Sequence, residues 1–241
     1  MEWIVVLAIG LLAGTVGAMV GFGTSIMLLP PLVIFFGPLE AVPMMAITAL
    51  MANLSRVMVW WRDVDWKACG AYVVTAAPAA GLGAATLVNL SSKTVELALG
   101  VFFLAMIPAR RRLEASGLKV RLWHLSVVGA VIGYLTGIVV STGPINTPWF
   151  LAYGLVKGPF LSTEALGSLG MYVAKAIVFN QLGALPWAIL SKGLIVGTSV
   201  MAGAWVAKRF VIRMTAAQFR LLMEALMLVA GLTMIVTALW G

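Results

Sequence analysis

Two basic residues lie inside apolar stretches of this chain. Arg56 stands in "ALMANLSRVMVW" and Lys175 stands in "GMYVAKAIVF". No acidic residue is close enough in sequence to neutralise either charge, and Asn53 would share a helical face with Arg56. The planar fork of an arginine matches the oxygens of a carboxylate or sulfonate, and a lysine acts as a point charge. These residue types therefore indicate recognition of a small anion.

Two polar, glycine-containing segments offer further anion-binding groups. One is "GFGTS", which begins at Gly21, and the other is "STGPINTP", which runs over Ser141–Pro148. Glycine or proline breaks a helix in each segment, and the unpaired N–H groups and positive dipole end of the next helix attract an anion. We expect Thr24 or Ser25 to cap the first new helix, and Thr147 to cap the second with the following proline at its first position.

The composition identifies the medium that surrounds these groups. Hydrophobic residues make up 62% of the 241 residues and charged residues only 10%, far from the balance of a soluble domain. Four uncharged runs approach or exceed the roughly 20 residues that span a bilayer, namely Trp3–Leu39, Ala68–Ser92, Leu125–Val156 and Ala225–Gly241. We expect an all-α polytopic integral membrane protein. Irregular backbone at membrane depth is buried in protein or lines a wet cavity, so the polar breaks should line a site.

A weak internal repeat appears at a spacing of roughly 116 to 120 residues. This shift superposes Gly21 on Gly137 and Arg56 on Lys175. We expect a first membrane repeat over residues 1–110, a basic cytoplasmic linker over 111–121 and a second membrane repeat over 122–241.

Each repeat divides at its turn signals into about five helical segments. The expected segments of the first half are Trp3–Val20, Ser25–Phe36, Ala41–Trp61, Ala68–Asn89 and Thr94–Ala109. Those of the second half begin near Leu122, Pro148, Leu161, Trp187 and Ala216. The second segment of each half is short, and whether it spans the bilayer or is re-entrant stays open at this point.

An odd number of crossings per half inverts the second half relative to the first, and the loop charges agree with that arrangement. If the linker is cytoplasmic, the loops that contain Arg62, Lys157 and "KRFVIR" are cytoplasmic as well. The "GPLE" and "LGALP" turns and both ends of the chain, which have no Lys or Arg, are then external, and Lys93 is the exception. We expect two inverted-topology repeats whose broken helices meet near the midplane of the cell's inner membrane.

Four stretches resemble the TauE/SafE family of sulfite and organosulfonate membrane transporters, namely "GTVGAMVGFGTS", "GAVIGYLTG", "NLSRVMVWWRDVDWK" and "AKRFVIRMTAAQFRLLMEALMLVAGL". The resemblance covers nearly the whole chain. It implies an anion carrier that exports sulfite, sulfonates or related small organic acids.

The residues and the resemblance together predict one substrate site for a small anion. Its expected members are Gly21, Gly23, Thr24, Ser25, Asn53, Arg56, Ser141, Thr142, Gly143, Asn146, Thr147 and Lys175. We expect alternating access within the lipid bilayer, without a cofactor or a metal. Co-transport of a proton or a sodium ion, and assembly as a homodimer, are left open. The net charge of +8 comes from clusters at helix ends, which argues against nucleic-acid binding.

Several alternatives remain beside this prediction. Both cations lie within about two helical turns, roughly 8 to 10 Å, of an expected helix end and could reach the interface instead. Glycines at four-residue spacing, including Gly10, Gly14 and Gly129, could serve only for close helix packing.

Glu164 is interpreted as a helix-start acid with Ser162 as the cap, and a proton-coupling carboxylate is its minor alternative. A passive anion channel is the rival function. A membrane-embedded enzyme is a poorer one, because no nucleophile with a base and no acid cluster is apparent in the sequence.

Overall fold

The computed structural model describes residues 2–21, 23–36, 38–87, 119–138, 142–183 and 185–211, and isolated positions between 101 and 117 and between 215 and 236. Over these residues the chain forms eight α-helices and one short 3-10 helix, with no strand. The prediction of an all-α fold is confirmed.

The helices follow the expected segments closely in the first half. They are α1 (Glu2–Val20), α2 (Gly23–Phe36), α3 (Pro38–Trp60), the 3-10 helix η1 (Trp61–Asp63) and α4 (Trp66–Leu87). The second half contains α6 (Leu122–Ile138), α7 (Gly143–Tyr153), α8 (Lys157–Gln181) and α9 (Trp187–Val211). The expected segments Thr94–Ala109 and the one from Ala216 fall mostly outside the described residues.

The expected start of α7 near Pro148 is wrong. This helix begins at Gly143, and Pro148 lies inside it. The segment contains two prolines, and it is Pro144 that stands in the first turn, where a missing N–H group costs nothing.

The expected start of α8 near Leu161 is also wrong. This helix begins at Lys157, after the extended residue Val156. Pro159 stands in its first turn, where proline is tolerated because the N–H groups there have no partner within the helix.

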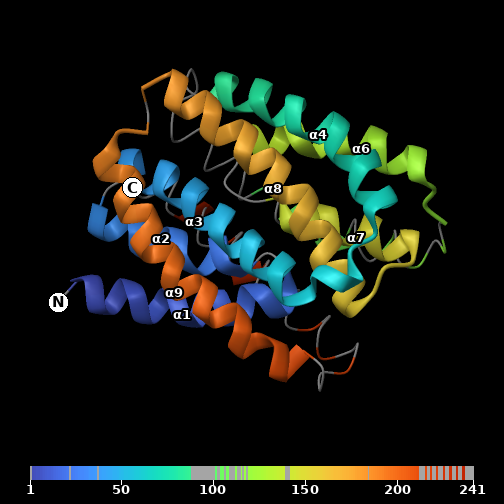
Figure 1. The fold of residues 1–241 in the computed structure, drawn as a ribbon, viewed down its shortest axis with the longest axis horizontal. Helices are drawn as coiled ribbons and strands as arrows, with labels where there is room; N and C mark the ends of the chain where they lie inside the picture. The colour runs from blue at the N-terminus through green and yellow to red at the C-terminus, as the bar shows by residue number, and fades with distance from the viewer. Residues whose placement is uncertain are drawn as a thin grey trace.

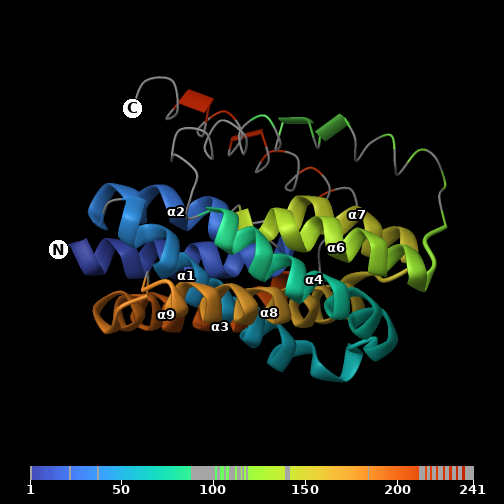
Figure 2. The same ribbon diagram turned by 90° about the horizontal axis from the view of Figure 1, so that it is seen from above.

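The helices form two packed groups, and each group includes one helix from the other half of the sequence (Figure 1). The first helix group contains α1, α2 and α3 together with α9, around a core that includes Leu28, Met44 and Val196. The second helix group contains α6, α7 and α8 together with α4, around a core that includes Tyr72 and Phe150. Seen from above, α1 and α2 lie toward one end of the molecule, and α6 and α7 toward the other (Figure 2). Helices α3 and α8 meet between the groups.

Glycines allow the paired helices to approach closely. A Cβ atom at Gly133 of α6 would lie 2.2 Å from the carbonyl oxygen of Ala76 in α4. A Cβ atom at Gly14 of α1 would lie 2.3 Å from the carbonyl oxygen of Val200 in α9. Any larger side chain would separate these helices. The close packing expected at Gly10, Gly14 and Gly129 is confirmed.

The helices run in two opposed sets of directions. Along the contacts of α1 with α9, and of α4 with α6, residue numbers increase together, so each pair is parallel. Helix α3 is parallel to α9, since Glu40 pairs with Lys192 near their starts and Lys208 Nζ donates to the Val59 carbonyl oxygen near their ends. Helix α3 is antiparallel to α8, and α4 is parallel to α8. In the pairs α1 and α6, α3 and α8, and α4 and α9, the corresponding helices of the two halves therefore run in opposite directions, while the inverted repeat itself stays a prediction.

Several described helices have the length or the apolar character of membrane segments. The stretches Pro43–Asp63, Trp66–Leu87 and Trp187–Arg209 are long and apolar enough to cross a membrane. Shorter apolar helical stretches are Trp3–Met19, Gly23–Val33 and Leu122–Ile138. Large apolar side chains such as Val74 and Leu82 are exposed on the outer surface, where lipid would solvate them. The chain is therefore a membrane protein.

Candidate functional site

A small cavity lies between the two helix groups, beside Arg56. Its volume is about 30 Å³, which is room for about two water molecules. It is bounded by the start of α2, the middle of α3, the end of α6, the start of α7 and the middle of α8. The polar part of its wall consists of Thr24, Ser25, Asn53, Arg56, Thr136, Thr142, Glu164, Ser168 and Tyr172.

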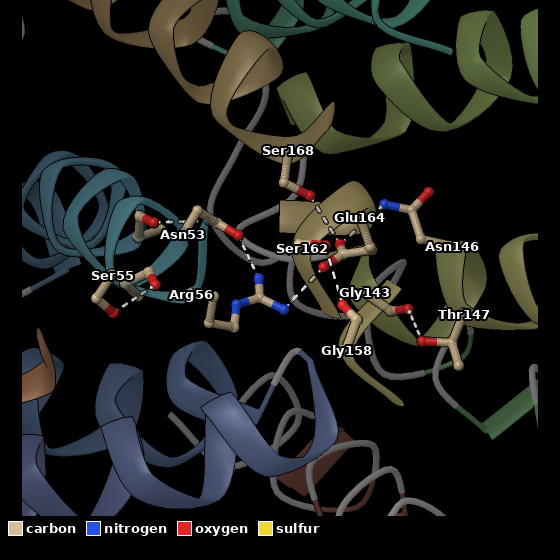
Figure 3. A network of polar contacts seen from close by, with 12 residues as sticks. Asn53, Ser55, Arg56, Gly143, Asn146, Thr147, Gly158, Ser162, Glu164 and Ser168 are labelled. Carbon is tan, nitrogen blue, oxygen red and sulfur yellow. Dashed lines mark hydrogen bonds and ion pairs between the residues drawn. The ribbon is translucent and has the colours of Figure 1, made fainter. Parts of the chain in front are cut away.

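The guanidinium of Arg56 is buried and ion-paired. The residue is 6% exposed, and its Nη1 atom lies 2.8 Å from Oε2 of Glu164 in α8. Its Nη2 atom donates to the amide oxygen of Asn53, one turn earlier on the same helix, as Figure 3 shows. The shared helical face of Asn53 and Arg56 is confirmed. The acid that balances the arginine comes from the other helix group.

The interpretation of Glu164 as a helix-start acid is wrong. Because α8 begins at Lys157, Glu164 lies two turns inside the helix and is 2% exposed. Ser162 does not cap α8, and its hydroxyl donates to the Gly158 carbonyl oxygen at 2.9 Å. The position of Glu164 beside Arg56 makes it part of the cavity wall.

A hydrogen-bonded chain satisfies the other carboxylate oxygen of Glu164. The hydroxyl of Ser168 donates to Oε1 at 2.8 Å, and Nδ2 of Asn146 lies 3.4 Å from the same atom. The hydroxyl of Tyr72 donates to the amide oxygen of Asn146 at 2.5 Å. Helices α4, α7 and α8 thus supply the partners that a buried carboxylate needs when its charge is balanced by one arginine.

The start of α2 faces the cavity, although its cap differs from the expectation. Gly21 has φ of 99°, a conformation that favours glycine, and its N–H group donates to the Gly17 carbonyl oxygen at 2.7 Å. Helix α2 begins at Gly23, so Thr24 and Ser25 are inside its first turn and neither is the cap. The hydroxyl of Thr24 donates to the Ala13 carbonyl oxygen of α1 at 3.2 Å.

The start of α7 also reaches the cavity, through Thr142 and Gly143. Thr142 occupies the cap position, without a hydrogen bond from its side chain to the helix. The expected cap Thr147 is wrong, because it lies inside α7 and donates to the Gly143 carbonyl oxygen at 2.9 Å. Ser141 falls outside the described residues.

Lys175 is buried but is not among the residues that line the cavity. The residue is 1% exposed, and its Nζ atom donates to the Thr136 carbonyl oxygen at 3.1 Å. This carbonyl lies in the last turn of α6, the negative end of a helix dipole. Nζ also lies 5.4 Å from the centre of the Phe179 ring. Because Arg56 and Lys175 both have buried head groups, the alternative that they reach the interface is wrong.

The structure thus brings most of the predicted site residues to one place. Gly21, Thr24, Ser25, Asn53, Arg56, Thr142 and Gly143 line the cavity. Gly23, Asn146, Thr147 and Lys175 are buried nearby or behind this lining. Whether these residues bind a substrate stays a prediction.

Sequence reasoning missed the contributions of Thr136, Glu164 and Ser168. A signal for two of them exists, since Glu164 and Ser168 are four residues apart and share one face of a helix. A second signal is charge balance, because a buried arginine requires a nearby acid or anion.

The arrangement has the groups needed to hold an oxyanion. The guanidinium, the hydroxyls and the first turns of α2 and α7 surround the same space, and each can donate to oxygen atoms. The guanidinium is already paired with Glu164, so an anion must compete with this carboxylate.

The family model described as sulfite exporter TauE/SafE matches residues 6–234. No curated protein and no solved structure matches the chain significantly. The matched span includes both helix groups almost completely and every residue that lines the cavity. The chain therefore belongs to the sulfite exporter TauE/SafE family.

Proposed function

We propose that this protein is a secondary transporter that exports small oxyanions, such as sulfite, organosulfonates or related organic acids, across the cell's inner membrane. Membership of the TauE/SafE family supports the transport of sulfite-like anions. The observation that carries the proposal is the buried guanidinium of Arg56 beside a cavity that also includes the first turns of α2 and α7.

The donors around the cavity suit an anion with two or three oxygens on one atom. Arginine can pair with two such oxygens through parallel N–H groups. The hydroxyls of Thr24 and Ser25 lie at the start of α2, where backbone N–H groups have no partner within the helix. The oxyanion would therefore lie between Arg56 and the start of α2.

The position of the cavity between the helix groups supports alternating access. If one group rotates against the other at the contact of α3 with α8, the cavity opens first to one side of the membrane and then to the other. The opposite directions of corresponding helices support this mechanism, because two halves of inverted topology form such a pair of states.

A counterflow experiment tests the proposal and separates a carrier from a passive anion channel. Liposomes that contain the purified protein are loaded with unlabelled sulfite and diluted into a trace of radiolabelled sulfite, with the membrane potential held at zero. A carrier exchanges the two and accumulates label transiently, whereas a channel lets the internal sulfite leave without accumulation. Failure of the unaltered protein to accumulate label would contradict the proposal.

A matched pair of variants connects transport with the cavity. Arg56→Gln is expected to abolish accumulation, because it removes the guanidinium that pairs with the anion. Arg62→Gln is the control, since Arg62 is exposed on η1 and lies 5.4 Å from the Trp61 ring. Equal accumulation by both variants would place the substrate elsewhere.

An inward gradient of protons or of sodium ions, imposed on the same liposomes, identifies the coupling ion.

A further inference from the structure

The terminal nitrogens of the Arg56 guanidinium are both engaged in this structure. Nη1 donates to Glu164 Oε2 at 2.8 Å, and Nη2 donates to Asn53 Oδ1. The carboxylate of Glu164 therefore has the position on the guanidinium that one edge of a bound oxyanion would take.

The space beside this ion pair is small. The cavity of about 30 Å³ has room for about two water molecules. Sulfite has four non-hydrogen atoms, and every organosulfonate has more. Arg56 and Glu164 both line this space, and an oxyanion that pairs with Nη1 must take the place that the Glu164 carboxylate holds.

We infer that Glu164 is a built-in counter-anion, which the transported oxyanion displaces from Arg56, and that Glu164 takes up one proton when it is displaced. This inference rests on the proposed function and adds a residue and a co-transported ion to it. The proton comes from a hydronium ion in the water on the side from which the anion enters. One O–H bond of the hydronium ion breaks, which leaves a water molecule, and one O–H bond forms on the carboxylate.

The surroundings of Glu164 suit both of its states. In the paired state Oε2 accepts from Arg56, and Oε1 accepts from Ser168 at 2.8 Å. After displacement Arg56 pairs with the oxyanion. The Glu164 carboxylate, which is 2% exposed, would then be buried without a cation if it stayed ionised. A protonated carboxyl group keeps the hydrogen bond from Ser168 and gains an O–H donor for the oxyanion.

The other charged and titratable groups around Glu164 are not carboxylates. Arg56 faces it from α3, and Tyr72 of α4 reaches it by way of Asn146. From α8 itself, Tyr172 lines the same cavity and Lys175 lies further along, with its Nζ atom on the Thr136 carbonyl oxygen. Helix α7 contributes the neutral amide of Asn146. Among the described residues that line the cavity, Glu164 is the one carboxylate.

Calorimetry on the complete protein in detergent tests the inference with methanesulfonate as the probe. This anion has no titratable proton near neutral pH, so any proton exchanged belongs to the protein. Titration in two buffers of different ionisation enthalpy gives the number of protons taken up for each anion bound. We expect one proton per anion, and an affinity that falls by up to about tenfold for each unit that the pH rises.

Two variants identify the group that takes up the proton. Glu164→Gln keeps the shape of the side chain but cannot exchange a proton. It should bind methanesulfonate about tenfold more tightly or better, because no buried carboxylate must be displaced, and its affinity should not depend on pH. Glu40→Gln is the matched control. Glu40 does not line the cavity, and its Oε2 atom lies 2.5 Å from Lys192 Nζ. It should keep the proton uptake of the unaltered protein.

The outcomes separate the inference from the proposed function. Binding by the unaltered protein without proton uptake would overturn the inference and leave the oxyanion site in place. Proton uptake that persists in Glu164→Gln would assign the proton to another group and overturn it as well. No binding of methanesulfonate or of sulfite would contradict both proposals. Because the buffer measurement uses the unaltered protein, the test does not depend on whether a variant folds.

Discussion

Arg56 of α3 and Glu164 of α8 are 108 residues apart in sequence, yet their side chains meet at 2.8 Å between the two helix groups. Both side chains are almost completely buried. A buried ion pair is costly to desolvate and becomes more costly when one member is removed. The same pair therefore links the stability of the helix bundle with the chemistry of the cavity.

Removal of one member of this pair should destabilise the protein strongly. Arg56→Met leaves the carboxylate of Glu164 buried without its cation, and we expect the free energy of unfolding to fall by about 3–5 kcal/mol. The double variant Arg56→Met, Glu164→Met should recover most of this loss, because no unpaired charge remains. Unfolding in detergent of Arg56→Met, of Glu164→Met and of the double variant measures the coupling. Losses that simply add would show that the two side chains do not interact.

The break between α1 and α2 should depend on glycine at position 21. Gly21 has φ of 99°, so Gly21→Ala forces a side chain into a left-handed conformation that costs about 1–2 kcal/mol. The new Cβ atom would also lie 3.4 Å from Nη1 of Arg56. Gly70→Ala is the control, because its Cβ would meet nothing within 4 Å inside α4. This control should be neutral or more stable, and a similar loss in both variants would contradict the strain argument.

The hydroxyl of Tyr72 should contribute to the network around Glu164. Tyr72→Phe removes the donor to Asn146 in a fully buried environment, and we expect a loss of about 1–2 kcal/mol in the free energy of unfolding. Tyr134→Phe removes a hydroxyl that is 3.3 Å from Thr86 on an exposed surface, so it should change stability little. Equal midpoints of thermal unfolding for these two variants would count against the network.

The contact between α4 and α6 should not tolerate even a methyl group. In Gly133→Ala the Cβ atom would lie 2.2 Å from the carbonyl oxygen of Ala76, so the two backbones must separate. We expect a loss of about 1–3 kcal/mol and a lower yield of folded protein. Gly81→Ala places its Cβ at an ordinary 3.7 Å from Val178 and is the matched control. A normal yield and melting temperature for Gly133→Ala would mean that this contact is loose.

The predicted topology can be measured with cysteines on described, exposed turns. In a Cys69→Ala background, Arg62→Cys should react with an impermeant thiol reagent only from the cytoplasmic side, and Leu182→Cys only from the external side. Both positions are exposed at opposite ends of the bundle. Labelling of both from one side would contradict the assignment of the loops from their charges.

The sequence identified Arg56 because a charge in an apolar run is a local feature that needs no knowledge of the fold. The role of Glu164 could not be predicted in the same way. Its environment depends on the start of α8, which lies four residues before the expected one, and on a partner from a distant helix. The start of α7 was misplaced because two prolines, Pro144 and Pro148, both fit the first turn of a helix, and only tertiary packing selects between them.

The exchange of α4 and α9 between the helix groups has a consequence for the order of assembly during biosynthesis. Chains are made from the N-terminus, and their units form as they emerge. Once α8 has been synthesised, α4, α6, α7 and α8 are all present and the second helix group can close. The first helix group, although α1 to α3 are made before anything else, must wait for α9. Among the described helices, those that enter the membrane first are therefore the last to obtain all their neighbours, and until then the glycine-lined face of α1 remains open to lipid or to an insertion factor.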